Sequence, residues 1–208
     1  MQDVNFVLFC TTALMLIVTP GPDIIYIATR GIAQGRAIGL ISMLGVCSGY
    51  VVHTIFAMLG LSALLHASEF LFNLVRLAGA AYLLYLGIRM LLSRPHLQLS
   101  KTAVAVVHRK LFWTGLATSV MNPKGILFFF AFLPQFVVTD AGHVPMQMLV
   151  LGLTFTLLCM IVYGLVALVA GTLGNKLSGT PRFANFMQRV TGGILIVLGV
   201  RLALSQQR

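Results

Sequence analysis

The chain has 208 residues, of which 59% are apolar and only 9% are charged, and its mean hydropathy is +0.98. A soluble globular domain has about 25% charged residues, so this composition excludes that class and favours a chain embedded in a bilayer. The net charge of +10 does not indicate nucleic-acid binding, because the basic residues lie in short loops between long apolar runs rather than on one polar face.

Six apolar runs are long enough to cross a membrane, which takes about 20 residues in a helix. No segment alternates apolar and polar residues as the strands of a membrane barrel do. We therefore predict an all-α membrane protein with six transmembrane helices. The six runs cover residues 4–28, 37–65, 70–92, 111–138, 146–173 and 186–204.

The first run is interrupted by Pro20-Gly21-Pro22-Asp23. Two prolines in three positions remove two backbone donors and clash with the preceding turn, so the helix must break or kink. Gly21 is expected to supply unusual backbone dihedrals at the break. Because a charge is costly in hydrocarbon, Asp23 is expected to face the protein interior and to have a partner.

The fourth run is interrupted in a similar way by Asn122-Pro123-Lys124. A helix broken at bilayer depth frees N–H and C=O groups, which persist only where protein or a water-filled cavity supplies partners. A simple kink satisfied by neighbouring helices would explain either break alone. Since both breaks carry a charge at matching places, we expect them to face each other and to form one site.

Asp23 and Lys124 allow two interpretations. Either they pair as a structural clip, or Asp23 binds a substrate ammonium group or a proton while Lys124 binds a carboxylate. The second interpretation fits a zwitterion, because an acid and a base lie beside freed backbone dipoles. The predicted substrate-binding set is Pro20, Gly21, Pro22, Asp23, Asn122, Pro123 and Lys124.

His53 lies within the second run. A lone histidine in an apolar helix is usually a core residue, but histidine titrates near neutral pH and also suits a proton relay. Asp23 and His53 are therefore the two candidates for proton coupling. Tyr163 and Gln135 are weaker candidates for the site.

Other motifs favour packing over chemistry. Gly45-x-x-x-Gly49 predicts close helix packing in the second run, and the phenylalanines of residues 128–132 are expected to pack against lipid or neighbouring helices. The three cysteines form no CxxC or His/Cys pattern, and no Walker loop, nucleophile elbow or flavin fingerprint occurs in the sequence. We therefore predict no metal, no cofactor and no enzymatic activity.

The basic residues are distributed unevenly about the six predicted spans. Ten of the fourteen Lys and Arg lie in or beside the three loops of one side, whereas Asp3, Glu69 and Asp140 lie on the opposite side. The positive-inside rule places the basic loops in the cytoplasm and both termini outside. Five full spans instead of six would move one terminus to the other side.

A weak internal repeat supports six spans. Residues 76–89 of the third run resemble residues 189–201 of the sixth, and the breaks fall in the first and fourth runs. This predicts one transporter domain over residues 1–208, made of half-repeats at about 1–95 and 108–208 that a basic cytoplasmic loop joins. Because each half has an odd number of spans, the second half runs through the membrane upside down, as in many transporters.

Five motifs occur in order along the chain: Pro20-Gly21-Pro22-Asp23, the glycine-rich second run, residues 79–87, Asn122-Pro123-Lys124-Gly125 and residues 132–136. Together they resemble the LysE/RhtB family of amino-acid exporters over essentially the whole chain. The resemblance is greatest to the branch that exports threonine, homoserine and leucine. It implies a carrier of the bacterial inner membrane that expels amino acids or their analogues, driven by the proton gradient, and it implies no particular substrate.

We therefore expect a secondary exporter that acts by proton antiport. Its expected partners are the amino-acid substrate, protons and the lipid bilayer, with no nucleic acid and with a homo-oligomer left open. A small cation exporter or channel is the alternative, although it would need more intramembrane acids than Asp23 alone. A redox carrier would need paired cysteines or haem-ligating histidines, and a purely structural subunit would need neither proline motif.

Overall fold

The computed structural model describes residues 3–61, 69–92 and 108–177, together with eight residues between 189 and 204. In these parts of the chain the residues are helical apart from short turns, and no β-strand occurs among them. The all-α prediction is therefore confirmed for the described residues. Most of the sixth predicted span, 186–204, lies outside them.

The first and fourth predicted spans are broken helices. Helix α1 (Asp3–Val18) meets α2 (Pro22–Gln34) at a bend of 53°, and α6 (His108–Val120) meets the segment that begins with α7 (Pro123–Leu127) at 49°. Each proline that follows a break is the first residue of the new helix, where the missing N–H removes no intrahelical bond. Beyond α7 the chain continues as the π-helical turn η2 (Phe128–Phe132), the 3-10 turn η3 (Leu133–Phe136) and, after a short gap, η4 (Thr139–Ala141).

Three further helices are unbroken by proline. Helix α3 covers Arg36–Phe56 and continues as the π-helical turn η1 (Ala57–Leu61), α5 covers Glu69–Leu92, and α8 covers Val144–Leu177. Among the described residues, two helices are long and apolar enough to cross a membrane, and up to four cross if each bent pair counts as one span. The protein is thus a membrane-spanning helical bundle.

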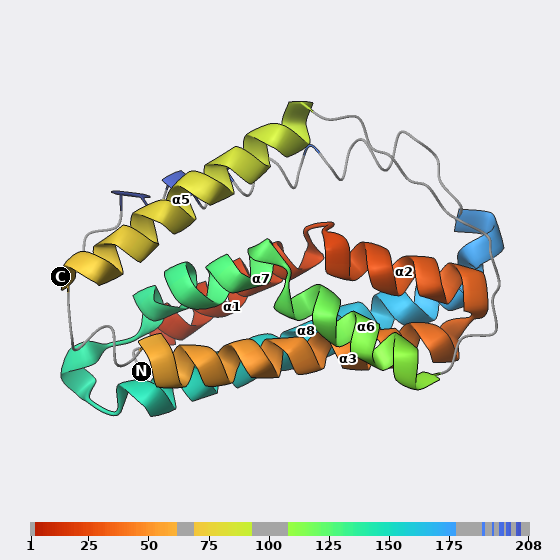
Figure 1. The fold of residues 1–208 in the computed structure, drawn as a ribbon, viewed down its shortest axis with the longest axis horizontal. Coiled ribbons are helices and arrows are strands. Elements are labelled where there is room, and N and C mark those ends of the chain that lie inside the picture. Colours follow the sequence, from red (N-terminus) through yellow and green to blue (C-terminus); the bar gives the residue numbers. More distant parts are fainter. Residues whose placement is uncertain are drawn as a thin grey trace.

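The helices alternate in direction along the chain. Figure 1 shows α1, α2, α5 and α8 running from left to right, whereas α3, α6 and α7 run from right to left. The reversal between α2 and α3 takes one residue, Gly35, whose φ of +89° lies in the left-handed region that favours glycine. The broken pair of the first half therefore runs opposite to the broken pair of the second half.

Helix α3 is the centre of the packing, because it contacts α2, α6 and α8. Its glycines allow these contacts: a Cβ on Gly45 would lie 2.2 Å from the Phe112 carbonyl oxygen of α6, and one on Gly49 would lie 2.6 Å from Ser119 Cβ. The prediction that Gly45 and Gly49 mark close helix packing is therefore confirmed.

Helix α8 has one face toward the protein interior and one face toward lipid. Phe155, Cys159 and Tyr163 are fully buried at four-residue spacing, whereas Leu157, Ile161 and Leu165 are exposed at the same spacing. Exposed aliphatic side chains on a membrane-spanning helix are favourable because they contact the apolar lipid tails. The phenylalanines after the second break pack inward, since Phe128 stacks on Phe155 with ring centroids 4.2 Å apart.

Replacement of Gly45 by alanine tests this packing. Gly45→Ala places a methyl group against a main-chain oxygen that cannot move freely, and overpacking of this kind costs about 1–3 kcal/mol. We expect a lower midpoint of thermal unfolding for the purified protein in detergent. The matched control is Gly164→Ala in α8, where the nearest atom to the new methyl group is the end of the flexible Met43 side chain at 3.9 Å. Equal unfolding midpoints for the two variants would contradict the predicted contact.

Candidate functional site

The two helix breaks contact each other in the interior of the bundle. The side-chain amide of Asn122, from the second break, donates a hydrogen bond of 2.6 Å to Oδ2 of Asp23, from the first. Both side chains are buried, with exposed fractions of 2% and 0%. The expectation that the breaks face each other and that Asp23 has a buried partner is therefore confirmed.

Asn122 serves both breaks at once. Its Oδ1 accepts a hydrogen bond of 3.0 Å from the main-chain N–H of Lys124, which caps the start of α7, while its Nδ2 reaches Asp23. Asparagine is among the preferred residues at a helix N-cap, and proline is preferred at the next position. The sequence Asn122-Pro123 is thus a local signal for a helix start that also supplies a donor to the facing break.

Lys124 satisfies the main chain of the opposite break. Its Nζ donates to the carbonyl oxygens of Leu16 at 3.1 Å and Thr19 at 3.0 Å. The last carbonyls of a helix have no intrahelical partner and carry partial negative charge, so a buried cation at the end of α1 is favourable. Lys124 and Asp23 therefore contact different partners, and the cation binds main-chain oxygen rather than the carboxylate.

Gly21 leaves room for the Lys124 side chain, and its dihedrals do not call for glycine. Its φ of −153° and ψ of −175° are extended backbone that any residue adopts, so the expectation of unusual dihedrals is wrong. A Cβ at this position would instead lie 3.3 Å from Nζ of Lys124. A side chain on residue 21 would press on the ammonium group that bonds to the end of α1.

The carboxylate of Asp23 has one occupied and one available oxygen. The Tyr50 hydroxyl and the Asn122 amide both donate to Oδ2, and Oδ1 accepts no hydrogen bond from the residues that the structure describes. An unpaired buried oxygen of this kind is costly. An ammonium group has three N–H donors, of which Lys124 uses two. The site therefore offers one anionic acceptor and one cationic donor.

Two tyrosines from different halves of the chain meet beside Asp23. The hydroxyl oxygens of Tyr50, in α3, and Tyr163, in α8, lie 3.4 Å apart, and both side chains are fully buried. Tyr50 is also packed edge-on against Phe155, with ring centroids 5.1 Å apart. The polar centre thus has an aromatic wall on the α8 side.

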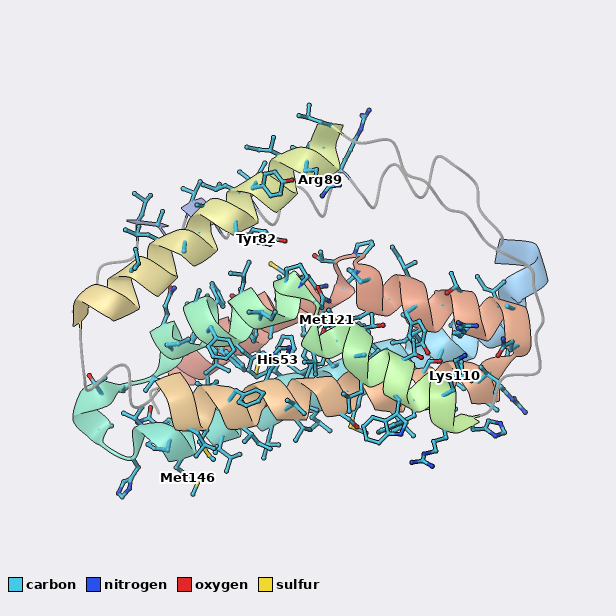
Figure 2. All side chains as sticks on the ribbon, viewed as in Figure 1. His53, Tyr82, Arg89, Lys110, Met121 and Met146 are labelled. Carbon is cyan, nitrogen blue, oxygen red and sulfur yellow. The ribbon has the colours of Figure 1, made fainter. Side chains whose placement is uncertain are left out.

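His53 lies in the same region but binds elsewhere. Its Nε2 lies 3.2 Å from the Ser119 carbonyl oxygen, and its ring stacks on Phe129 with centroids 5.5 Å apart. Figure 2 shows His53 in the interior of the bundle, between α3 and the segment after the second break. The histidine is one helical turn away from Tyr50 and is not bonded to Asp23.

Sequence reasoning missed Tyr50 and ranked Tyr163 low. One sequence signal could have found the pair: the tyrosines are 113 residues apart, which is also the separation of Arg76 and Arg189 in the internal repeat. Gln135, the other weak candidate, donates to the Ala131 carbonyl of its own segment. The remaining predicted site residues, Pro20, Pro22 and Pro123, lie at the breaks themselves.

Comparison with known proteins gives matches over nearly the whole chain. A membrane protein of Vibrio cholerae is 30% identical over 196 residues, which cover 94% of each chain. A leucine efflux protein of an Enterobacter species is 28% identical over 205 residues, covering 96% of this chain and 95% of the relative. A membrane protein of Bacillus subtilis is 26% identical over 202 residues. No solved structure gives a significant match.

The family model described as LysE type translocator matches residues 14–206. This span includes both proline breaks and every residue of the polar centre that they form. The match shows that the chain belongs to the LysE family of translocators, and it is therefore a membrane transporter and not an enzyme.

Proposed function

We propose that the protein exports amino acids or their analogues across the bacterial inner membrane by proton antiport. The observation that carries this proposal is the joined pair of breaks, with a buried acid and a buried base that each keep one hydrogen-bonding position unused among the described residues. The relatives named leucine efflux protein support an amino-acid substrate.

The charges at the site favour a neutral amino acid. Oδ1 of Asp23 would accept from the substrate ammonium group, and the third N–H of Lys124 would donate to its carboxylate. A second positive charge on the substrate would need a second acid, and Asp23 is the only acid within the six apolar runs. The substrate side chain would lie against the aromatic residues beside Tyr50.

Competition for Asp23 provides the antiport mechanism. A protonated carboxyl group cannot attract an ammonium group as a carboxylate does, so a proton and the substrate would bind to Asp23 in turn. Binding of a proton from outside would release the substrate there, and release of that proton inside would restore the carboxylate. His53 is the rival acceptor, since it is buried in the same region.

Alternating access would use an inverted repeat of six spans. The opposite directions of the two broken pairs and of α3 and α8 support this arrangement (Figure 1). The Tyr50–Tyr163 contact supports it further, because the tyrosines are 113 residues apart, as are Arg76 and Arg189 in the predicted repeat, and equivalent residues of two halves would meet in this way at a pseudo-twofold axis. Rocking of one half about this axis would expose the site on one face at a time, with the basic loops inside and both termini outside.

Charge removal at the site tests the proposal. Asp23→Asn and Lys124→Met should each reduce export of labelled leucine from loaded vesicles by about tenfold or more, because a hydrogen bond to a charged group contributes about 1.5–3 kcal/mol. Asp140→Asn and Lys101→Met remove the same charges outside the apolar runs and should export like wild type. Export at the wild-type rate by both site variants, correctly inserted, would end the proposal.

Substrate analogues test the two roles separately. Leucinamide keeps the ammonium group and lacks the carboxylate, whereas 2-oxo-4-methylpentanoate keeps the carboxylate and lacks the ammonium group. Each should compete with labelled leucine about tenfold less well than leucine itself, because each loses one charged hydrogen bond. Equal competition by the amide would remove Lys124 from binding, and equal competition by the oxo acid would remove Asp23.

His53→Gln tests the identity of the proton acceptor. If Asp23 carries the proton, this variant should respond to an imposed pH gradient within about twofold of wild type. The measurement compares gradient-driven export with leucine–leucine exchange in the same vesicles. A variant that keeps exchange but no longer responds to the gradient would make His53 the acceptor instead.

A further inference from the structure

A surface hollow of about 570 Å³ lies along α6, away from the substrate site. Its lining comes from two basic residues, a tryptophan, a threonine and an alanine of α6, and the surface that they present to the hollow is mainly apolar. The lining residues are Arg109, Lys110, Trp113, Thr114 and Ala117.

The packing of α6 explains why this face is open. Leu111, Gly115 and Ser119 are buried at four-residue spacing, and a Cβ on Gly115 would lie 2.7 Å from the Ser42 carbonyl oxygen of α3. The Tyr26 hydroxyl of α2 also donates to the Leu111 carbonyl at 2.8 Å. With this side fixed against α2 and α3, Arg109, Lys110 and Trp113 project from the opposite side of the helix. Trp113 is 55% exposed.

Helix α6, which lines the hollow, carries no acidic residue of its own. The sequence has four acidic residues, and Asp23 is buried at the substrate site. The other three are Asp3, Glu69 and Asp140, near the starts of α1, α5 and α8. Those helices begin at the left of Figure 1, whereas α6 begins at the right end. Arg109 and Lys110 thus have no acid on their own helix, and an anion from outside the chain can supply their counter-charge.

The lining has the order of groups that a lipid has. Arg and Lys bind phosphate oxygens through charged hydrogen bonds, tryptophan prefers the level of the headgroups, and apolar residues suit acyl chains. Along α6 the two cations come first, Trp113 follows one turn later, and Ala117 follows one turn after that. Figure 2 places Lys110 at the end of α6 that is remote from the second break and Met121.

From this hollow we infer a binding site for one anionic phospholipid, whose phosphate contacts Arg109 and Lys110 and whose acyl chain lies along Trp113 and Ala117. This site is separate from amino-acid export and does not depend on the proposed function. It ties the start of the second broken helix to the anionic leaflet, because α6 leads directly into the break at Asn122.

The single tryptophan of the chain makes a direct measurement available. The full-length protein is reconstituted in phosphatidylcholine vesicles, and dibromo-phosphatidylglycerol or dibromo-phosphatidylcholine is added, since bromine quenches tryptophan fluorescence on contact. We expect dibromo-phosphatidylglycerol to quench Trp113 with an apparent affinity at least about fivefold higher than that of dibromo-phosphatidylcholine. This factor corresponds to the contribution of one basic residue at an anionic surface.

A charge-matched pair of variants makes the test specific. Arg109→Gln with Lys110→Gln should abolish the preference for the anionic lipid, whereas Arg94→Gln with Lys101→Gln, which removes the same charge from the sequence between α5 and α6, should keep it. Equal quenching of the wild-type protein by the two lipids would overturn the inference. Loss of the preference in both double variants would also overturn it, because the attraction would then belong to the basic surface as a whole.

Discussion

The structure depends on the need to satisfy main-chain groups where a helix is broken inside the bilayer. Carbonyl oxygens at the end of α1 have no partner in their own helix, and hydrocarbon offers none. Lys124 of the facing break donates to two of them, and Asn122 of the same break donates to Asp23. The second break thus supplies donors to the end of α1, while Asp23 of the first break binds the Asn122 side chain that caps α7. These bonds join the two halves of the chain at their breaks.

The same bonds place polar groups inside the membrane-spanning bundle, and one of these groups, Oδ1 of Asp23, has no hydrogen-bond partner among the described residues. Tyr50 and Asn122 both bind Oδ2 of Asp23, which orients the carboxylate and leaves Oδ1 for another donor. The unoccupied Oδ1 and the third N–H of Lys124 are the positions that the proposed substrate would bind. In the proposed mechanism, binding there would act on the contact between the two halves.

The two ends of the second broken helix have different surroundings. The end of α6 at the break meets Asp23 through Asn122. The start of α6 carries Arg109, Lys110 and the exposed Trp113. Close contact with α3 at Gly45 and Gly115 fixes the helix between these ends. A lipid beside Arg109 and Lys110 would therefore act on the same helix that leads into the proposed substrate site.

The sequence by itself determined the membrane class, the helices and the places of both breaks, because hydropathy, run length and proline chemistry are local properties. Asp23, Asn122 and Lys124 were recognisable for the same reason, since a charge or amide beside a proline in an apolar run is costly wherever the chain folds. Only the tertiary structure decided which residues of the site form hydrogen bonds with each other. Lys124 donates to carbonyl oxygens at the end of α1 and not to the carboxylate of Asp23. Gly21 leaves room for Nζ of Lys124, and Tyr50 reaches Asp23 from α3. Such pairings join residues up to 108 positions apart, and only the packing of the helices brings them within hydrogen-bonding distance.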